Sequence, residues 1–110
     1  MSYDEDLANR VREALAAEAF TEKRMFGGLA FLVGGHMAVA VSRSGGLMVR
    51  VDPAETDALM AKPHAGPFEM RDRPVQGWLR VADEGLRTKR QLEPWVRRGT
   101  AYARSLPPKG

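Results

Sequence analysis

Residues 24–41 have the sequence RMFGGLAFLVGGHMAVAV, in which two Gly-Gly pairs bracket one apolar strand and a second apolar strand follows at once. Glycine tolerates the positive φ angles that tight hairpin turns require, so Gly34-Gly35 predicts a two-residue hairpin loop. Gly27-Gly28 is expected to kink the chain and to let another backbone pass close by. The stretch therefore predicts an antiparallel hairpin rather than a phosphate-binding loop, whose glycines would lie between a strand and a helix.

Helices and further strands are predicted on both sides of this hairpin. Asp4 predicts the start of a helix that ends near Ala19, and Asp52-Pro53 predicts the start of a second helix that reaches about Ala61. A third, long helix is expected from Thr88 to the prolines at 107–108. The predicted strands are residues 22–26, 28–33, 36–42, 47–51, 68–70 and 78–81, with a polar loop over 71–77.

These elements predict the α+β class. We expect two layers, with a central antiparallel sheet of about five to six strands and with N-terminal, middle and C-terminal helices. The first four strands are expected in meander order, because turns this short join only antiparallel neighbours. The last two strands are expected to form a second hairpin.

Length and composition favour one soluble domain over residues 1–110. The chain has 110 residues and no cysteine, which excludes disulfides and cysteine-bound zinc. It also has no basic, apolar leader and no apolar run near the roughly 20 residues that span a bilayer, so we expect a cytoplasmic protein without a membrane segment. The net charge of +3 is uneven, since residues 56–110 contain eleven Lys/Arg and six Asp/Glu. Such a field can attract an anionic partner.

Side-chain alternation in the predicted strands gives two unlike sheet faces. The odd positions are bulky, as expected of the face that packs on the core: Leu29, Phe31, Val33, Met37, Val39, Val41, Leu47, Val49 and Val51. The opposite face should be polar, but it carries Ala30, Leu32, Ala38 and Ala40. We therefore expect part of this second face to be covered, either by a helix of the same chain or by another protein, a second copy in a homodimer included.

No group of residues predicts a reaction centre, so we expect a protein that is not an enzyme and has no metal or cofactor. His36 and His64 lie outside any zinc-binding spacing. Asp52 and Glu55 have the spacing of a helix cap. The serines outside any nucleophile elbow are Ser42, Ser44 and Ser105.

The last predicted helix is basic along one line. Arg90, Arg97 and Arg104 recur every seven residues, which places them about 10 Å apart on one side of the helix. This line of arginines predicts either a solvated outer surface or a set of contacts to a protein partner or to nucleic-acid phosphates.

The aromatic residues leave one further alternative. Trp78, Trp95 and Tyr102 follow apolar patterns and are expected in the core. A small-ligand-binding domain would instead need a closed pocket, lined by Phe26, Phe68 and Trp78, with converging polar groups.

Five short motifs occur in order along the chain. They are residues 24–28 (RMFGG), 34–38 (GGHMA), 47–52 (LMVRVD), 67–70 (PFEM) and 102–109 (YARSLPPK). Together they resemble the TfoX/Sxy N-terminal domain family over nearly the whole chain. The resemblance implies a two-layer α+β fold similar to secretion-chaperone-like domains. It also implies a regulatory role, since the best-known members regulate natural competence together with the cyclic-AMP receptor protein.

The full-length regulators of that family carry a second, helical C-terminal domain, so we expect the present chain to be a stand-alone first domain. The family offers no established catalytic residues to carry over. Our leading hypothesis is a non-enzymatic binding or regulatory module that binds a protein partner, with a link to transcriptional regulation of competence. A nucleic-acid-binding protein and a small-ligand-binding domain are the alternatives.

Overall fold

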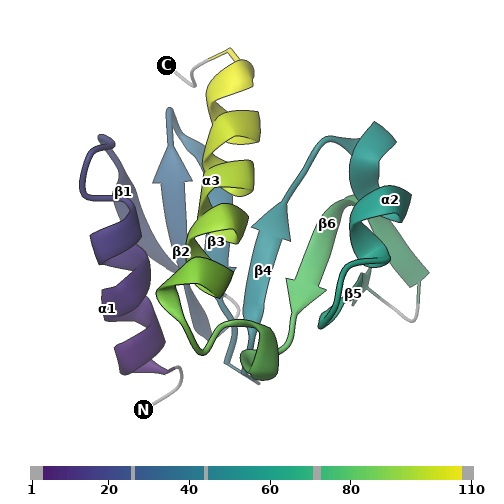
Figure 1. Ribbon diagram of the computed structural model, residues 1–110. Helices are drawn as coiled ribbons and strands as arrows, with labels where there is room; N and C mark the ends of the chain where they lie inside the picture. Colours follow the sequence, from purple (N-terminus) through teal and green to yellow (C-terminus); the bar gives the residue numbers. More distant parts are fainter. Residues whose placement is uncertain (1–3, 26, 44, 71–72, 108–110) are drawn as a thin grey trace.

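The computed structural model describes residues 4–25, 27–43, 45–70 and 73–107, and within them three helices pack on one face of a six-stranded antiparallel sheet (Figure 1). The helices are α1 (Glu5–Ala14), α2 (Thr56–Met60) and α3 (Lys89–Ser105), with 3-10 turns η1 (Pro53–Glu55) and η2 (Asp83–Gly85). The strands are β1 (Thr21–Met25), β2 (Gly28–Val33), β3 (His36–Val41), β4 (Leu47–Arg50), β5 (Ala65–Met70) and β6 (Arg73–Val81). The predicted two-layer α+β class is confirmed.

The strand order is β1-β2-β3-β4-β6-β5. The predicted meander of the first four strands and the second hairpin are both confirmed. The hairpin enters the sheet through β6, so η1 and α2 carry the chain from β4 to the outer strand β5. The two strands of this hairpin are also longer than predicted, and most of the expected loop over 71–77 belongs to β6.

A proline and a glycine explain why these longer strands were missed. Pro67 lies in β5, an edge strand, where its missing N–H donor is tolerated. Gly77 lies in β6 with a φ of +88°, within the irregular part of the β5–β6 pairing. Proline and glycine are common in loops, so both residues favour a loop prediction unless the strand order is known.

Side-chain caps begin the first and third helices. Asp4 accepts a hydrogen bond from the backbone N–H of Leu7 and begins α1, and Thr88 forms a reciprocal capping box with Gln91 at the start of α3. The first helix, however, ends at Ala14 rather than near residue 19. From there the chain turns back toward β1.

The hairpin between β2 and β3 has the predicted turn. Gly34 and Gly35 have φ angles of +62° and +84°, which suit a two-residue loop with two left-handed positions. A Cβ on Gly28 would overlap the carbonyl oxygen of Val41, so the predicted close approach of two backbones is also confirmed.

The core lies between the helices and the covered face of the sheet. Cross-strand register aligns Phe31, Val39, Val49 and Leu79 in one row and Leu29, Val41, Leu47 and Val81 in the next. The helices cover these rows mainly with Leu7, Val11, Leu92, Trp95 and Val96. Burial of these apolar side chains, at roughly 25 cal/mol per Å² removed from water, is the main source of stability.

A β-bulge in β3 changes which face its first residues occupy. Phe31 pairs with Val39, but Leu32 pairs with Met37, so Ala38 is an inserted residue. Ala38 packs with Ala103 of α3 on the covered side, and Met37 lies beside Leu32 on the opposite side. The predictions for Met37 and Ala38 are therefore wrong, because they assumed strict alternation along the strand.

Candidate functional site

The candidate site is the sheet face opposite the helices. Leu59 and Met60 of α2 join the same core cluster as α1 and α3, so all three helices pack on the covered face (Figure 1). Within the described ranges no helix lies over the other face. The expectation that a helix of the same chain covers it is therefore wrong, and a partner protein remains the other alternative.

We call this uncovered surface the open face and define it by its strand register. One cross-strand row consists of Lys23, Ala30, Ala40, Met48 and Arg80, which are successive partners on β1, β2, β3, β4 and β6. Leu32 and Met37 are partners in a neighbouring row. Cross-strand partners project from the same side of a sheet, so these side chains share one surface.

A hollow of about 300 Å³ lies on the open face. Its lining includes Met25, Met37, Ala40, Met48, Phe68 and Arg80. Ala30 is 0% and Ala40 is 6% exposed, because longer side chains stand on either side of them. The open face therefore has a floor of small residues and walls that are largely methionine, a flexible side chain that adapts to varied apolar surfaces.

The sequence of this sheet and its helices matches one protein family. The profile of the TfoX N-terminal domain matches residues 4–103, from the cap of α1 into the last turn of α3. The chain belongs to the TfoX N-terminal domain family. The match includes every strand of the sheet, and hence the whole open face. A search of curated proteins found no match.

Arg50 of this TfoX N-terminal domain lies at the end of β4 and reaches toward α3. Its guanidinium carbon lies 5.4 Å from the ring centroid of Trp78 and 5.5 Å from that of Tyr102, both within cation–π range. Neither ring belongs to the core clusters, so the expected core positions of Trp78 and Tyr102 are wrong, whereas that of Trp95 is confirmed. Arg50 and Trp78 meet because β4 pairs with β6 in the sheet. This pairing of distant segments cannot be predicted from the local sequence pattern.

Two of the three arginines predicted to line one side of α3 in this TfoX N-terminal domain lie within ion-pair distance of carboxylates. Arg104 forms a two-pronged pair with Glu18, with nitrogen–oxygen distances of 3.1 and 2.6 Å. Arg97 lies 4.0 Å from Glu93, and Arg90 is exposed. The three side chains therefore do not present an unbroken row of free cations.

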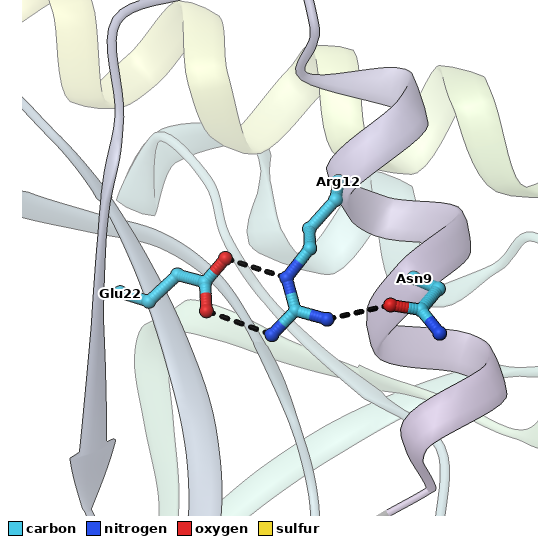
Figure 2. Close-up of polar contacts among 3 residues, drawn as sticks. All are labelled: Asn9, Arg12 and Glu22. Carbon is cyan, nitrogen blue, oxygen red and sulfur yellow. Dashed lines mark hydrogen bonds and ion pairs between the residues drawn. The ribbon is translucent and has the colours of Figure 1, made fainter.

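A second two-pronged pair ties α1 to β1 (Figure 2). Arg12 donates to both carboxylate oxygens of Glu22, at 2.6 and 2.8 Å, and to the amide oxygen of Asn9 at 2.7 Å. These hydrogen bonds, helped by the charge of Arg12, lower the pKa of Glu22 against the opposing effect of its partial burial. The pair lies on the covered side and holds the first helix against the sheet.

Other predicted candidates in this TfoX N-terminal domain have structural contacts. His36 lies with Nε2 2.7 Å from the carbonyl oxygen of Pro107, which joins β3 to the chain after α3. Asp52 accepts a hydrogen bond from the backbone N–H of Ala54 at 2.9 Å, so the predicted capping role is confirmed. No cluster of three or more metal-ligating side chains occurs in the described part of the chain.

Of the residues expected to line a ligand pocket, Phe68 and Trp78 come together, with ring centroids 6.3 Å apart. His64 lies in a turn with a φ of +67°, and the hydroxyl of Ser105 donates to the carbonyl of Tyr102. Phe26 and Ser44 lie outside the described residues. None of the helices that the structure describes is both long and apolar enough to cross a membrane.

Proposed function

We propose that this chain is a non-enzymatic regulatory module that binds a protein partner through its open face. The observation that carries the proposal is the 300 Å³ apolar hollow on a sheet face that no described helix covers. Apolar surfaces of this kind on a folded domain typically mark interaction sites. The methionine walls add to the argument, because methionine is favoured where one surface adapts to a partner.

Family membership supports a regulatory setting for this binding. The TfoX N-terminal domain family includes regulators of competence, so we propose that the partner belongs to transcriptional regulation related to competence. The cytoplasm is the compartment in which such regulators act, and it fits a chain without cysteine.

Binding of nucleic acid through α3 is the alternative, and the side-chain contacts weigh against it. Arg104 would have to leave Glu18, and Arg97 would have to leave Glu93, before either could contact a phosphate. Fluorescence anisotropy with a labelled DNA duplex at low salt tests this alternative. Binding that weakens steeply with salt and falls in the Arg90→Ala variant would favour it over a protein partner.

Site-specific photo-crosslinking tests the protein-binding function. A benzoylphenylalanine is placed at Met48 on the open face and, in a matched control, at the exposed Ala101 on α3, and each protein is irradiated in the native cell. We expect a discrete crosslinked protein from position 48 and not from position 101. That protein, expressed separately, should bind the wild-type chain and lose at least tenfold in affinity for Met48→Glu. Crosslinks from position 101 alone would contradict the proposal. Equal affinity of the wild type and Met48→Glu for the crosslinked protein would also contradict it.

A further inference from the structure

A cleft lies between α3 and the segment that links β4 to α2. Figure 1 shows β4 between the two helices, and the cleft has a volume of about 320 Å³. Small-molecule sites have volumes of roughly 300–1,000 Å³. The floor of the cleft is apolar, since Val51 is 2% exposed and Leu59 packs against the core. This cleft is on the covered side of the sheet and is therefore separate from the open face.

The two walls of the cleft carry opposite charges. Asp52 and Glu55 line it at η1, and Arg98 lines it from α3. Asp52 caps η1 through its side chain, but the side chains of Glu55 and Arg98 have no hydrogen bond or ion pair with the described residues. Opposite charges that line one cleft without pairing leave hydrogen-bonding groups that a ligand can engage.

Arg98 is suited to bind a carboxylate. Its guanidinium carbon lies 4.9 Å from the ring centroid of Trp95, a core residue that is 6% exposed. Arginine presents its N–H donors in the plane of the guanidinium, so a ring against its face leaves donors for a two-pronged contact. A restrained side chain also loses less conformational entropy when a ligand binds.

The width of the cleft limits the size of a ligand that contacts both walls. A cube with the volume of the cleft has sides of about 7 Å. Two charge-assisted hydrogen bonds of about 2.8 Å each, joined by a short ligand body, span such a width. An α-amino acid has its ammonium and carboxylate groups on the same carbon atom, so it presents both charges at a short separation and leaves its side chain for the apolar floor.

Ligands with a single charge suit this cleft less well. A phosphate or another simple anion would lie beside Asp52 and Glu55, which repel it. A simple amine would lie beside Arg98, which repels it in the same way. Only a ligand with both charges satisfies the two walls.

We propose that the cleft between η1 and α3 binds a small zwitterion with an apolar side chain, of the α-amino-acid class. Arg98 binds the carboxylate, Glu55 binds the ammonium group, and Val51 and Leu59 contact the apolar side chain. This site goes beyond the protein-binding function and does not depend on it, because the two surfaces share no residue.

Three compounds with the same branched hydrocarbon chain test the inference. They are L-leucine, 4-methylpentanoate, which lacks the ammonium group, and 3-methylbutylamine, which lacks the carboxylate. Binding to the full chain is followed by NMR shifts of the Val51 and Leu59 methyl groups. We expect leucine to bind with a dissociation constant of about 1 mM or below and about tenfold more tightly than either analogue.

Variants of the two walls separate the charges from the apolar floor. Arg98→Gln should lower the affinity for leucine about tenfold, to that of 3-methylbutylamine, and Glu55→Gln should lower it to that of 4-methylpentanoate. Arg90→Gln on α3 and Asp57→Asn on α2 change exposed charges outside the cleft and should leave leucine binding unchanged. Backbone amide spectra verify that each variant is folded.

Two results would overturn the inference. One is the absence of shifts at Val51 and Leu59 with leucine at about 10 mM, well above the expected dissociation constant. The other is equal binding of the three compounds, which would show that the charged walls select nothing. Neither result bears on the crosslinking at Met48, so failure of this site and failure of the protein-binding function are distinguishable.

Discussion

Gly99 of α3 lies directly against the backbone carbonyl of Ala38 in β3, with no room for a side chain between them. A Cβ at position 99 would overlap the carbonyl oxygen of Ala38 and come within 2.9 Å of Val39 Cγ1. The bulge that inserts Ala38 and the glycine that admits the close approach of α3 therefore belong together. This contact places the long helix over the centre of the covered face.

Gly99→Ala should destabilise the domain. We expect the free energy of unfolding to fall by about 2 kcal/mol, because overpacking against backbone outweighs the roughly 1 kcal/mol that alanine gains over glycine in a helix. Urea unfolding followed by circular dichroism measures the change. Gly66→Ala is the matched control: a Cβ there meets nothing within 4 Å, so its stability should stay equal or rise slightly. A Gly99→Ala variant as stable as the wild type would contradict the close packing.

The pair between Arg12 and Glu22 should make stability depend on pH. The folded-state pKa of Glu22 is lowered, so its carboxylate stabilises the fold fully above the ordinary value of 4.5 and loses this effect as the pH falls through the lower folded value. Glu22→Gln should therefore lower the free energy of unfolding by about 0.5 kcal/mol at pH 7, a modest amount because both side chains are partly exposed. The difference from wild type should disappear in acid.

Unfolding of wild type and Glu22→Gln in a series of buffers, with a carboxyl NMR titration of Glu22, measures this effect. Glu13→Gln, at an exposed position of α1, is the control and should change stability by less than about 0.5 kcal/mol at every pH. A titration of Glu22 above its ordinary pKa would be incompatible with the pair in Figure 2.

Two buried threonines should respond in opposite directions to the same substitution. The hydroxyl of Thr100 has no hydrogen-bond partner among the described residues, so Thr100→Val should raise the free energy of unfolding by about 1 kcal/mol. The hydroxyl of Thr56 accepts a hydrogen bond from the backbone N–H of Gly77 at 2.9 Å. Thr56→Val should therefore cost about 1–3 kcal/mol. If the two variants changed stability alike, the hydrogen bonding described for these hydroxyls would be incorrect.

The ion pair between Arg104 and Glu18 should form again when the acidic and basic residues are swapped between the two positions. Arg104→Glu places two carboxylates together, and we expect a loss of about 1 kcal/mol for a partly exposed site. The double variant Glu18→Arg/Arg104→Glu should recover at least half of that loss in urea unfolding. No recovery would mean that the pair does not persist in solution.

Local chemistry made much of the fold predictable. The caps at Asp4 and Asp52 and the turn at Gly34-Gly35 depend on residues within three or four positions of each other, and each occurs as expected. The apolar character of the open face was also visible, since Ala30 and Ala40 occupy even positions of regular strands.

What could not be predicted depends on contacts between distant residues. The bulge at Ala38 is favoured by its contacts with Gly99 and Ala103, more than sixty positions away, and it moves Met37 onto the open face. The partners Arg50 and Trp78 meet only because β6, rather than β5, enters the sheet beside β4. The sequence pattern therefore predicted the alanines of the open face. The positions of Met37, Arg50 and Trp78 became known only from the strand pairing in the structure.

The described helices cover one face of the sheet and leave the other uncovered. Solvent relaxation enhancement by a neutral gadolinium chelate, read at the methyl groups of the isolated chain, tests this arrangement most directly. We predict strong enhancement for Leu32, Met37 and Met48 on the open face and none for Leu79 and Val81, which are 0% exposed on the covered face. Equal protection of both sets would contradict the account.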